Sequence, residues 1–239
     1  MSENNFNISG DYQFEALNHG KLLQKAWHAL RLEAAQYSLR KCEYINVLDA
    51  GCGSGVMLNA LSSSGMNLTG VDFSERSVIF AKKYLAEFSP AIMQAEIENT
   101  GMQVDSQDLI LCCEVLEHVK QCKAVEALNH FYEILKPGGY LYITVPNKKS
   151  LWPVIEKFLD MTKLVPQLNN TQHVTEYSLG KMKSIIENAG FSICDKGTFN
   201  FMSPLFYTLA KPAGKFVLKT ELKFLRFGGP LLFFLAKKI

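Results

Sequence analysis

The chain has 239 residues, of which 48% are hydrophobic, 11% aromatic and 20% charged, and its formal net charge is +2 at pH 7. This length suits one α/β domain with insertions or two small domains, and the apolar content is sufficient for a large core. The small net charge excludes a general attraction to nucleic acid, and no apolar run reaches the ~20 residues of a membrane-spanning helix.

Helical spacing of apolar residues over 11–41 predicts an N-terminal helical cap, or lid, over residues 1–41. From residue 42 onward, short apolar runs alternate with helical patterns, which indicates a parallel sheet with right-handed crossovers. The expected strands are 45–50, 68–72, 91–95, 109–113 and 140–145, and the expected helices are 56–61, 75–88 and 124–135. A turn is expected at Lys136-Pro137-Gly138-Gly139.

Two late strands, 191–198 and 231–236, are expected to form an edge hairpin. The predicted fold class is therefore α/β: a Rossmann-like, doubly wound, seven-stranded sheet that is mostly parallel, with an antiparallel last strand. The domain spans residues 42–239 and carries insertions at about 147–176 and 199–229. Long segments of this kind often carry function, and they leave the sheet near the end where ligands of open α/β sheets bind.

The six cysteines are Cys42, Cys52, Cys112, Cys113, Cys122 and Cys194. They show neither CxxC pairs nor the density of a disulfide framework, which is typical of buried thiols in a reducing compartment. The first ten residues are polar and poor in basic side chains, so they do not resemble a secretory signal. We therefore expect a soluble, cytoplasmic protein.

The most informative motif is a predicted strand that ends in Asp49 and is followed by Gly51, Gly53 and Gly55. Glycine adopts positive φ and lets a ligand approach the main chain closely. A dinucleotide site favours the spacing G-x-G-x-x-G and would place a diphosphate against the acid. An acid beside the turn instead favours a positively charged ligand, so we prefer S-adenosylmethionine to a dinucleotide.

Further cofactor contacts are expected after the next two strands. Asp72 ends the second strand, where a carboxylate can accept hydrogen bonds from both ribose hydroxyls, and we include its neighbour Phe73. Ser74 is the better candidate for the following helix cap. Glu96 is expected to accept a hydrogen bond from the adenine amino group, and Ile97 to offer a backbone N–H and an apolar surface. The alternative to ribose binding is that Asp72 is a helix cap or a surface acid. The alternative to adenine binding is that Glu96 is an ordinary loop acid.

In this order, the motifs resemble class I S-adenosylmethionine-dependent methyltransferases, in particular the ubiquinone-biosynthesis O-methyltransferases within the type 11 and type 12 methyltransferases. The resemblance covers roughly residues 25–195. It rests on residues 47–55, 71–72, 96–98, 108–119, 135–139, 145–147 and 189–191. It implies that Arg31, Gly51, Asp72 and Cys113 contact the cofactor. Arg31 would hold the cofactor carboxylate through its planar guanidinium, and Cys113 would frame the methionine arm. A solvated helix arginine is the alternative for Arg31.

Glu114, Glu117 and His118 follow the fourth strand at positions i, i+3 and i+4, which share one face of a helix. Such a group could hold a divalent cation, and the resemblance implies Mg²⁺. His173, in the first insertion, could close over this site. We also consider Glu114, His118 and His173 as the catalytic group, with either histidine as general base. A structural role, in which the acids offset a helix dipole, stays open.

Lysines recur every four residues in the second insertion, with Arg226 beyond them, and apolar residues lie between them. They are Lys211, Lys215, Lys219 and Lys223. A helix over 211–226 would carry a basic ridge beside an apolar face. This pattern suits the inner face of a membrane or an anionic, lipid-like acceptor. A solvated lysine face over a packed helix is the alternative.

The sequence thus predicts an enzyme that transfers a methyl group from S-adenosylmethionine to a small-molecule acceptor, most simply a hydroxyl of a quinone or phenol. A sugar, glycolipid or amine acceptor is the main alternative. A non-catalytic protein that binds the cofactor is the alternative outside the enzymes. A nucleic-acid methyltransferase lacks support, because no Asn-Pro-Pro-Tyr-like tetrapeptide follows the fourth strand.

Overall fold

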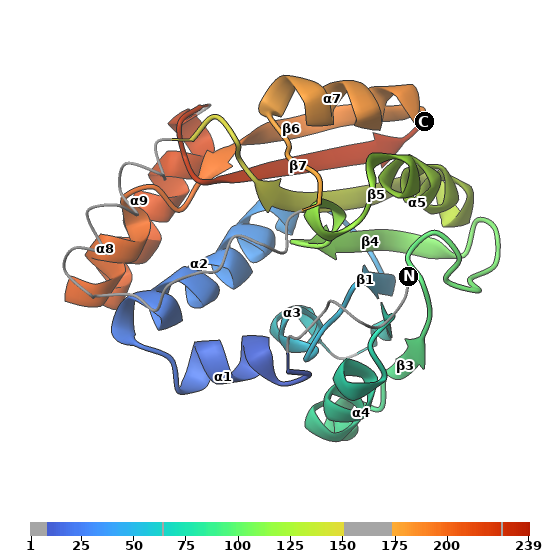
Figure 1. The fold of residues 1–239 in the computed structure, drawn as a ribbon, viewed down its shortest axis with the longest axis horizontal. Coiled ribbons are helices and arrows are strands. Elements are labelled where there is room, and N and C mark those ends of the chain that lie inside the picture. The colour runs from blue at the N-terminus through green and yellow to red at the C-terminus, as the bar shows by residue number, and fades with distance from the viewer. Residues whose placement is uncertain (1–8, 64, 151–173, 226) are drawn as a thin grey trace.

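The computed structural model describes residues 9–63, 65–150, 174–225 and 227–239. Its centre is a seven-stranded sheet in the order β3-β2-β1-β4-β5-β7-β6, with helices on either side (Figure 1). Strands β1 to β5 run parallel, whereas β7 pairs antiparallel with both β5 and β6. The predicted α/β class and the mostly parallel sheet are therefore confirmed.

The strands lie within a few residues of their predicted positions. They are β1 Asn46–Ala50, β2 Asn67–Asp72, β3 Ala91–Gln94, β4 Gln107–Cys113, β5 Leu135–Pro146, β6 Phe191–Phe199 and β7 Leu231–Lys238. The turn expected at 136–139 is wrong as a separate element, because these residues form an irregular start of β5. There, Gln107 pairs with Leu135 but Leu109 pairs with Tyr140, so the longer segment bulges out of register.

The helices in the described part of the chain are α1 Tyr12–Asn18, α2 Leu22–Leu39, α3 Val56–Leu61, α4 Glu75–Tyr84, α5 Gln121–Ile134, α7 Leu179–Asn188, α8 Ser203–Leu209 and α9 Lys211–Phe224. Short 3₁₀ turns lie at η2 Ala86–Phe88 and η3 Leu116–His118. Residues 11–41 form two helices rather than one, and the second insertion folds into α8 and α9. None of the helices described here combines the length and the apolar character that crossing a bilayer requires.

Two hydrophobic cores lie on opposite faces of the sheet. One core contains Leu48 together with residues of α5 and α7, and the other contains its neighbour Val47 together with residues of α2, α3, α4 and α9. Successive residues of a strand point to opposite faces, so both Val47 and Leu48 are fully buried. This explains why the strands read as continuous apolar runs in the sequence.

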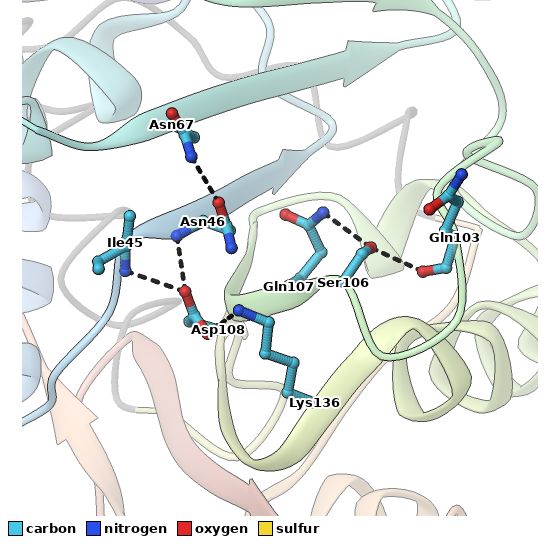
Figure 2. A network of polar contacts seen from close by, with 8 residues as sticks. All are labelled: Ile45, Asn46, Asn67, Gln103, Ser106, Gln107, Asp108 and Lys136. Atoms are coloured by element: carbon cyan, nitrogen blue, oxygen red, sulfur yellow. Dashed lines mark hydrogen bonds and ion pairs between the residues drawn. The ribbon is translucent and has the colours of Figure 1, made fainter.

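Asp108, at the start of β4, connects three neighbouring strands at the amino end of the sheet (Figure 2). Its Oδ2 accepts hydrogen bonds from the backbone N–H of Ile45 at 3.1 Å and of Asn46 at 2.8 Å. Its Oδ1 accepts one from Lys136 Nζ at 2.7 Å, at the start of β5. Burial raises the pKa of Asp108, but these hydrogen bonds outweigh it and the net pKa is lowered. One ionised carboxylate thus holds three strands together, at the end opposite to the predicted site.

We predict that Asp108→Asn lowers the free energy of unfolding by about 1–3 kcal/mol at neutral pH, because the hydrogen bonds lose an ionic acceptor. A carboxyl group whose folded-state pKa is lowered stabilises the fold above its unfolded pKa, and this stabilisation is lost as the pH falls through the folded pKa. Urea denaturation of the wild type, of the variant and of the exposed control Glu87→Gln measures the effect. An equal difference in strongly acidic solution would contradict the assignment.

Candidate functional site

The glycine turn lies at the carboxyl end of β1, where the chain passes into α3. Gly51, Gly53 and Gly55 all have positive φ, at 84°, 53° and 81°. A Cβ added to Gly51 would lie 2.4 Å from a methyl carbon of Val115, which follows β4. The turn is therefore packed so closely against the neighbouring chain that this position requires glycine.

A pocket opens beside this turn and is lined by elements that are distant in the sequence. Its walls are Gln13 and Leu17 of α1; His28, Arg31 and Leu32 of α2; Asp49 of β1; Gly51 and Cys52 of the turn; Val56 and Met57 of α3; and Cys113 of β4. Four residues predicted to bind the cofactor thus meet in one place, and they are Arg31, Asp49, Gly51 and Cys113.

Asp49 is the most unusual residue in this pocket, because it is 2% exposed and its Oδ2 has no hydrogen-bond partner among the described residues. Burial, and then the charge of Asp72, raise its pKa to about 7. The Nε of Arg31 is likewise buried without a partner in the described chain. Unsatisfied buried polar atoms are costly. A ligand that carries an ammonium and a carboxylate, as a methionine group does, would satisfy both.

Asp72 is anchored by backbone hydrogen bonds at the carboxyl end of β2. Its Oδ2 accepts from the N–H of Gly53 and its Oδ1 from the N–H of Ser74, both at 2.9 Å. Burial raises its pKa, although the two hydrogen bonds oppose this shift. The predicted cap is confirmed, because Ser74 Oγ accepts from the N–H of Ser77 at the start of α4. The carboxylate therefore orients the glycine turn directly.

The residues predicted near the adenine lie beyond β2 and β3. The charge of Glu96 contributes to the raised pKa of Asp72, so the two carboxylates lie near each other. Ile97 is buried and its side chain belongs to the core that includes α5. The carbonyl of Phe73 accepts a hydrogen bond from Gln94 Nε2 at 2.9 Å. Roles for these three residues in adenine binding stay predictions.

The sequence predicted an N-terminal cap over residues 1–41, but it did not single out the residues by which α1 reaches the pocket. The N–H of Phe14 donates to Ser54 Oγ at 3.1 Å, which ties α1 to the turn. A Cβ added to Gly53 would lie 2.8 Å from Oε1 of Gln13, so the Gln13 side chain lies directly over the turn. No motif marks Gln13 or Leu17 in the sequence, because their place depends on how α1 folds back.

His28 and Cys113 complete the pocket without adding charge to it. Burial, and then the charge of Arg31, lower the pKa of His28 to about 3, so the imidazole is neutral at physiological pH. Burial, and then the charge of Asp49, raise the pKa of the Cys113 thiol. Both side chains are thus uncharged in the ligand-free protein, and the ionic contacts available to a ligand come from Arg31 and Asp49.

The predicted helical face of Glu114, Glu117 and His118 is wrong. Glu114 has a positive φ of 58°, and its N–H donates to the carbonyl of Thr144. Only the other two residues belong to the short turn η3. Glu117 is buried, and its Oε1 lies 3.9 Å from His118 Nε2. The chain thus bends sharply after β4 instead of starting a helix.

The geometry does not fit the predicted magnesium site. Among the described residues, no group of three or more histidine, cysteine, aspartate or glutamate side chains is arranged to hold a metal ion. Burial, and then the charge of Glu114, raise the pKa of Glu117 well above its usual range, which opposes metal binding by this carboxyl. His173, predicted to close over the site, lies outside the described residues. The mechanism proposed below uses no metal ion.

Residues 19–196 match the family model described as a methyltransferase domain. The chain belongs to this methyltransferase domain family. Two curated relatives are both named ubiquinone biosynthesis O-methyltransferase. The protein from Bordetella avium is 29% identical over 126 residues, which are 52% of each chain. The protein from Pseudomonas aeruginosa is 32% identical over 105 residues, which are 43% of this chain and 44% of that protein. The chain therefore spans about half the length of the curated relatives it matches.

Solved structures of other methyltransferases share the fold. A SAM-dependent methyltransferase from Archaeoglobus fulgidus superimposes with a TM-score of 0.64 at 21% identity, covering 95% of this chain and 99% of that chain. Magnesium protoporphyrin IX methyltransferase from Synechocystis, solved with bound SAH, gives 0.61 at 18% identity, covering 91% and 87%. At these identities the likeness shows the fold, and it confirms the predicted Rossmann-like architecture.

Asp49 predicts a pH-dependent affinity for S-adenosylmethionine. A positively charged ligand favours the ionised carboxylate, so the affinity should rise by roughly tenfold or more between about pH 5.5 and 7.5, as a group with a pKa of about 7 ionises. Asp49→Asn should bind more weakly near pH 7.5 and lose this dependence. Isothermal titration calorimetry measures both proteins, with circular dichroism as the control for folding.

Without a ligand, the stability of the folded protein should fall over the pH range in which the affinity for S-adenosylmethionine rises. Because the folded-state pKa of Asp49 is raised, the stability that its proton confers is present below the unfolded pKa and is lost as the pH rises towards about 7. The difference in thermal stability between the wild type and Asp49→Asn should change accordingly across this range. A wild-type affinity that does not vary with pH, or a variant that keeps the full dependence, would refute the role of Asp49.

Proposed function

We propose that this member of the methyltransferase family transfers a methyl group from S-adenosylmethionine to a hydroxyl oxygen of a small quinone- or phenol-like acceptor. The observation that carries the cofactor assignment is a pair of buried atoms on one pocket beside the glycine turn, Asp49 Oδ2 and Arg31 Nε, neither of which has a hydrogen-bond partner among the described residues. The curated relatives named ubiquinone biosynthesis O-methyltransferase support the choice of acceptor.

In this proposal Arg31 binds the cofactor carboxylate, Asp49 the ammonium group, and Asp72 the ribose hydroxyls. When bound, the cofactor supplies a methyl group activated by its sulfonium charge. The chain's own task is to align the acceptor with that methyl group and to exclude water. Gln13 and Leu17 would help to exclude water, since α1 lies over the turn.

A hydroxyl acceptor must also lose its proton, and the bend after β4 supplies candidates for the base. His118 lies beside the buried carboxyl of Glu117, and a carboxyl oxygen of Glu114 is buried without a partner among the described residues. We propose that His118 takes the proton and that Glu114 orients the hydroxyl. The bend directly follows Cys113, which lines the pocket, and this adjacency in the chain supports the proposal.

The test is methyl transfer from radiolabelled S-adenosylmethionine to a panel of acceptors that contains a catechol, a demethylated hydroquinone, a sugar, a glycolipid and an amine. We expect labelled ether products from the catechol or hydroquinone. His118→Ala should lower turnover by about 100-fold or more, while its affinity for S-adenosylhomocysteine stays near that of the wild type.

Each other result has a distinct meaning. Label in the sugar, glycolipid or amine alone would replace the quinone- or phenol-like acceptor with one of those classes. Turnover that EDTA removes and Mg²⁺ restores would contradict the metal-free mechanism. Tight cofactor binding with no acceptor methylated would favour a non-catalytic role.

A further inference from the structure

Exposed apolar side chains are concentrated on the helical pair α8–α9. Of the sixteen large hydrophobic residues exposed in the described part of the chain, seven lie between residues 202 and 227. They are Met202, Leu205, Phe206, Leu209, Phe216, Phe224 and Phe227. Leu209 is 78% exposed and Phe216 is 71% exposed. Single exposed apolar residues are ordinary, but a concentration of them marks an interaction surface.

This helical pair is firmly attached to the domain. Leu218 and Leu222 of α9 are buried in the same core as residues of α2. The buried carboxylate of Glu221 accepts hydrogen bonds from the N–H groups of Met202 and Ser203 at 2.6 and 2.9 Å, and from Ser203 Oγ at 2.7 Å. The apolar residues on the outside are therefore held on a rigid support, at the left end of the molecule in Figure 1.

The same surface is basic. Between residues 202 and 227 the sequence contains four lysines and one arginine but a single acid, Glu221, whose carboxylate is buried. On α9, Phe216, Lys219 and Lys223 are spaced i, i+3 and i+7 and are all exposed, so they share the outer face. Lys215 differs, because it forms an ion pair with Glu33 of α2.

We propose that the α8–α9 surface binds the interface of an anionic lipid bilayer. Exposed aromatic and aliphatic side chains insert at the boundary between headgroups and acyl chains, while lysines beside them contact lipid phosphates. The absence of any exposed acid among the described residues of this surface favours an anionic bilayer over a mixed-charge protein partner. The proposal does not depend on the identity of the acceptor. Binding to a membrane would nevertheless keep the pocket close to a substrate dissolved in that membrane.

The experiment is co-sedimentation of the full chain with vesicles of phosphatidylcholine and phosphatidylglycerol, at low and at high salt. We expect binding that salt weakens and that vesicles of phosphatidylcholine alone do not support. Lys219→Glu/Lys223→Glu should weaken binding by at least about 20-fold, because each lysine at an anionic surface is worth about fivefold. Leu209→Ser/Phe216→Ser should weaken binding at both salt concentrations, because it removes the apolar anchors.

The matched control is Lys82→Glu/Lys83→Glu, which makes the same change of charge on two exposed lysines of α4. It should bind like the wild type. Affinity for S-adenosylhomocysteine, measured on every variant, shows whether the domain is folded and separates this proposal from the proposed activity. No binding at low salt, or equal losses in the two charge variants, would overturn the proposal. A concentration-dependent dimer that Leu209→Ser/Phe216→Ser abolishes, without vesicle binding, would assign the surface to a second copy of the chain.

Discussion

The site depends on two carboxylates that are buried side by side at the ends of neighbouring parallel strands. Asp72 is held by the N–H groups of Gly53 and Ser74, whereas Asp49 has an oxygen without any partner in the described chain. Burial, and then the charge of Asp72, raise the pKa of Asp49 to about 7. Such a pair is unfavourable in an empty protein and becomes favourable when a cation binds.

The sequence predicted what depends on local patterns. Alternating apolar runs and helical segments indicated the sheet, because both faces of its strands are buried, as the adjacent residues Val47 and Leu48 illustrate. The spacing of the glycines indicated the turn, because few residues other than glycine readily adopt a positive φ. Arg31, Asp49, Gly51 and Cys113 were named as cofactor contacts and do line one pocket, although their individual roles await the experiments above.

The predictions that were wrong or missing concern features set by tertiary contacts, which no local sequence pattern reports. The segment from Lys136 to Gly139 has the composition of a turn, but pairing with β4 draws it into β5 as a bulge. The spacing of Glu114, Glu117 and His118 suits a helix, but the left-handed backbone at Glu114 breaks that geometry. Gln13 reaches the pocket only because α1 folds back over the turn.

The match over residues 19–196 establishes the family. The acceptor is a proposal, because no sequence motif marks the residues that would surround it.

We propose above all that the glycine turn and its two aspartates bind a positively charged methyl donor rather than a dinucleotide. Calorimetric titration of the wild-type protein with S-adenosylmethionine and, separately, with NAD at neutral pH tests this claim most directly. We expect saturable binding of one S-adenosylmethionine per chain and no heat of binding with NAD. Binding of NAD, or the absence of binding with S-adenosylmethionine, would contradict it.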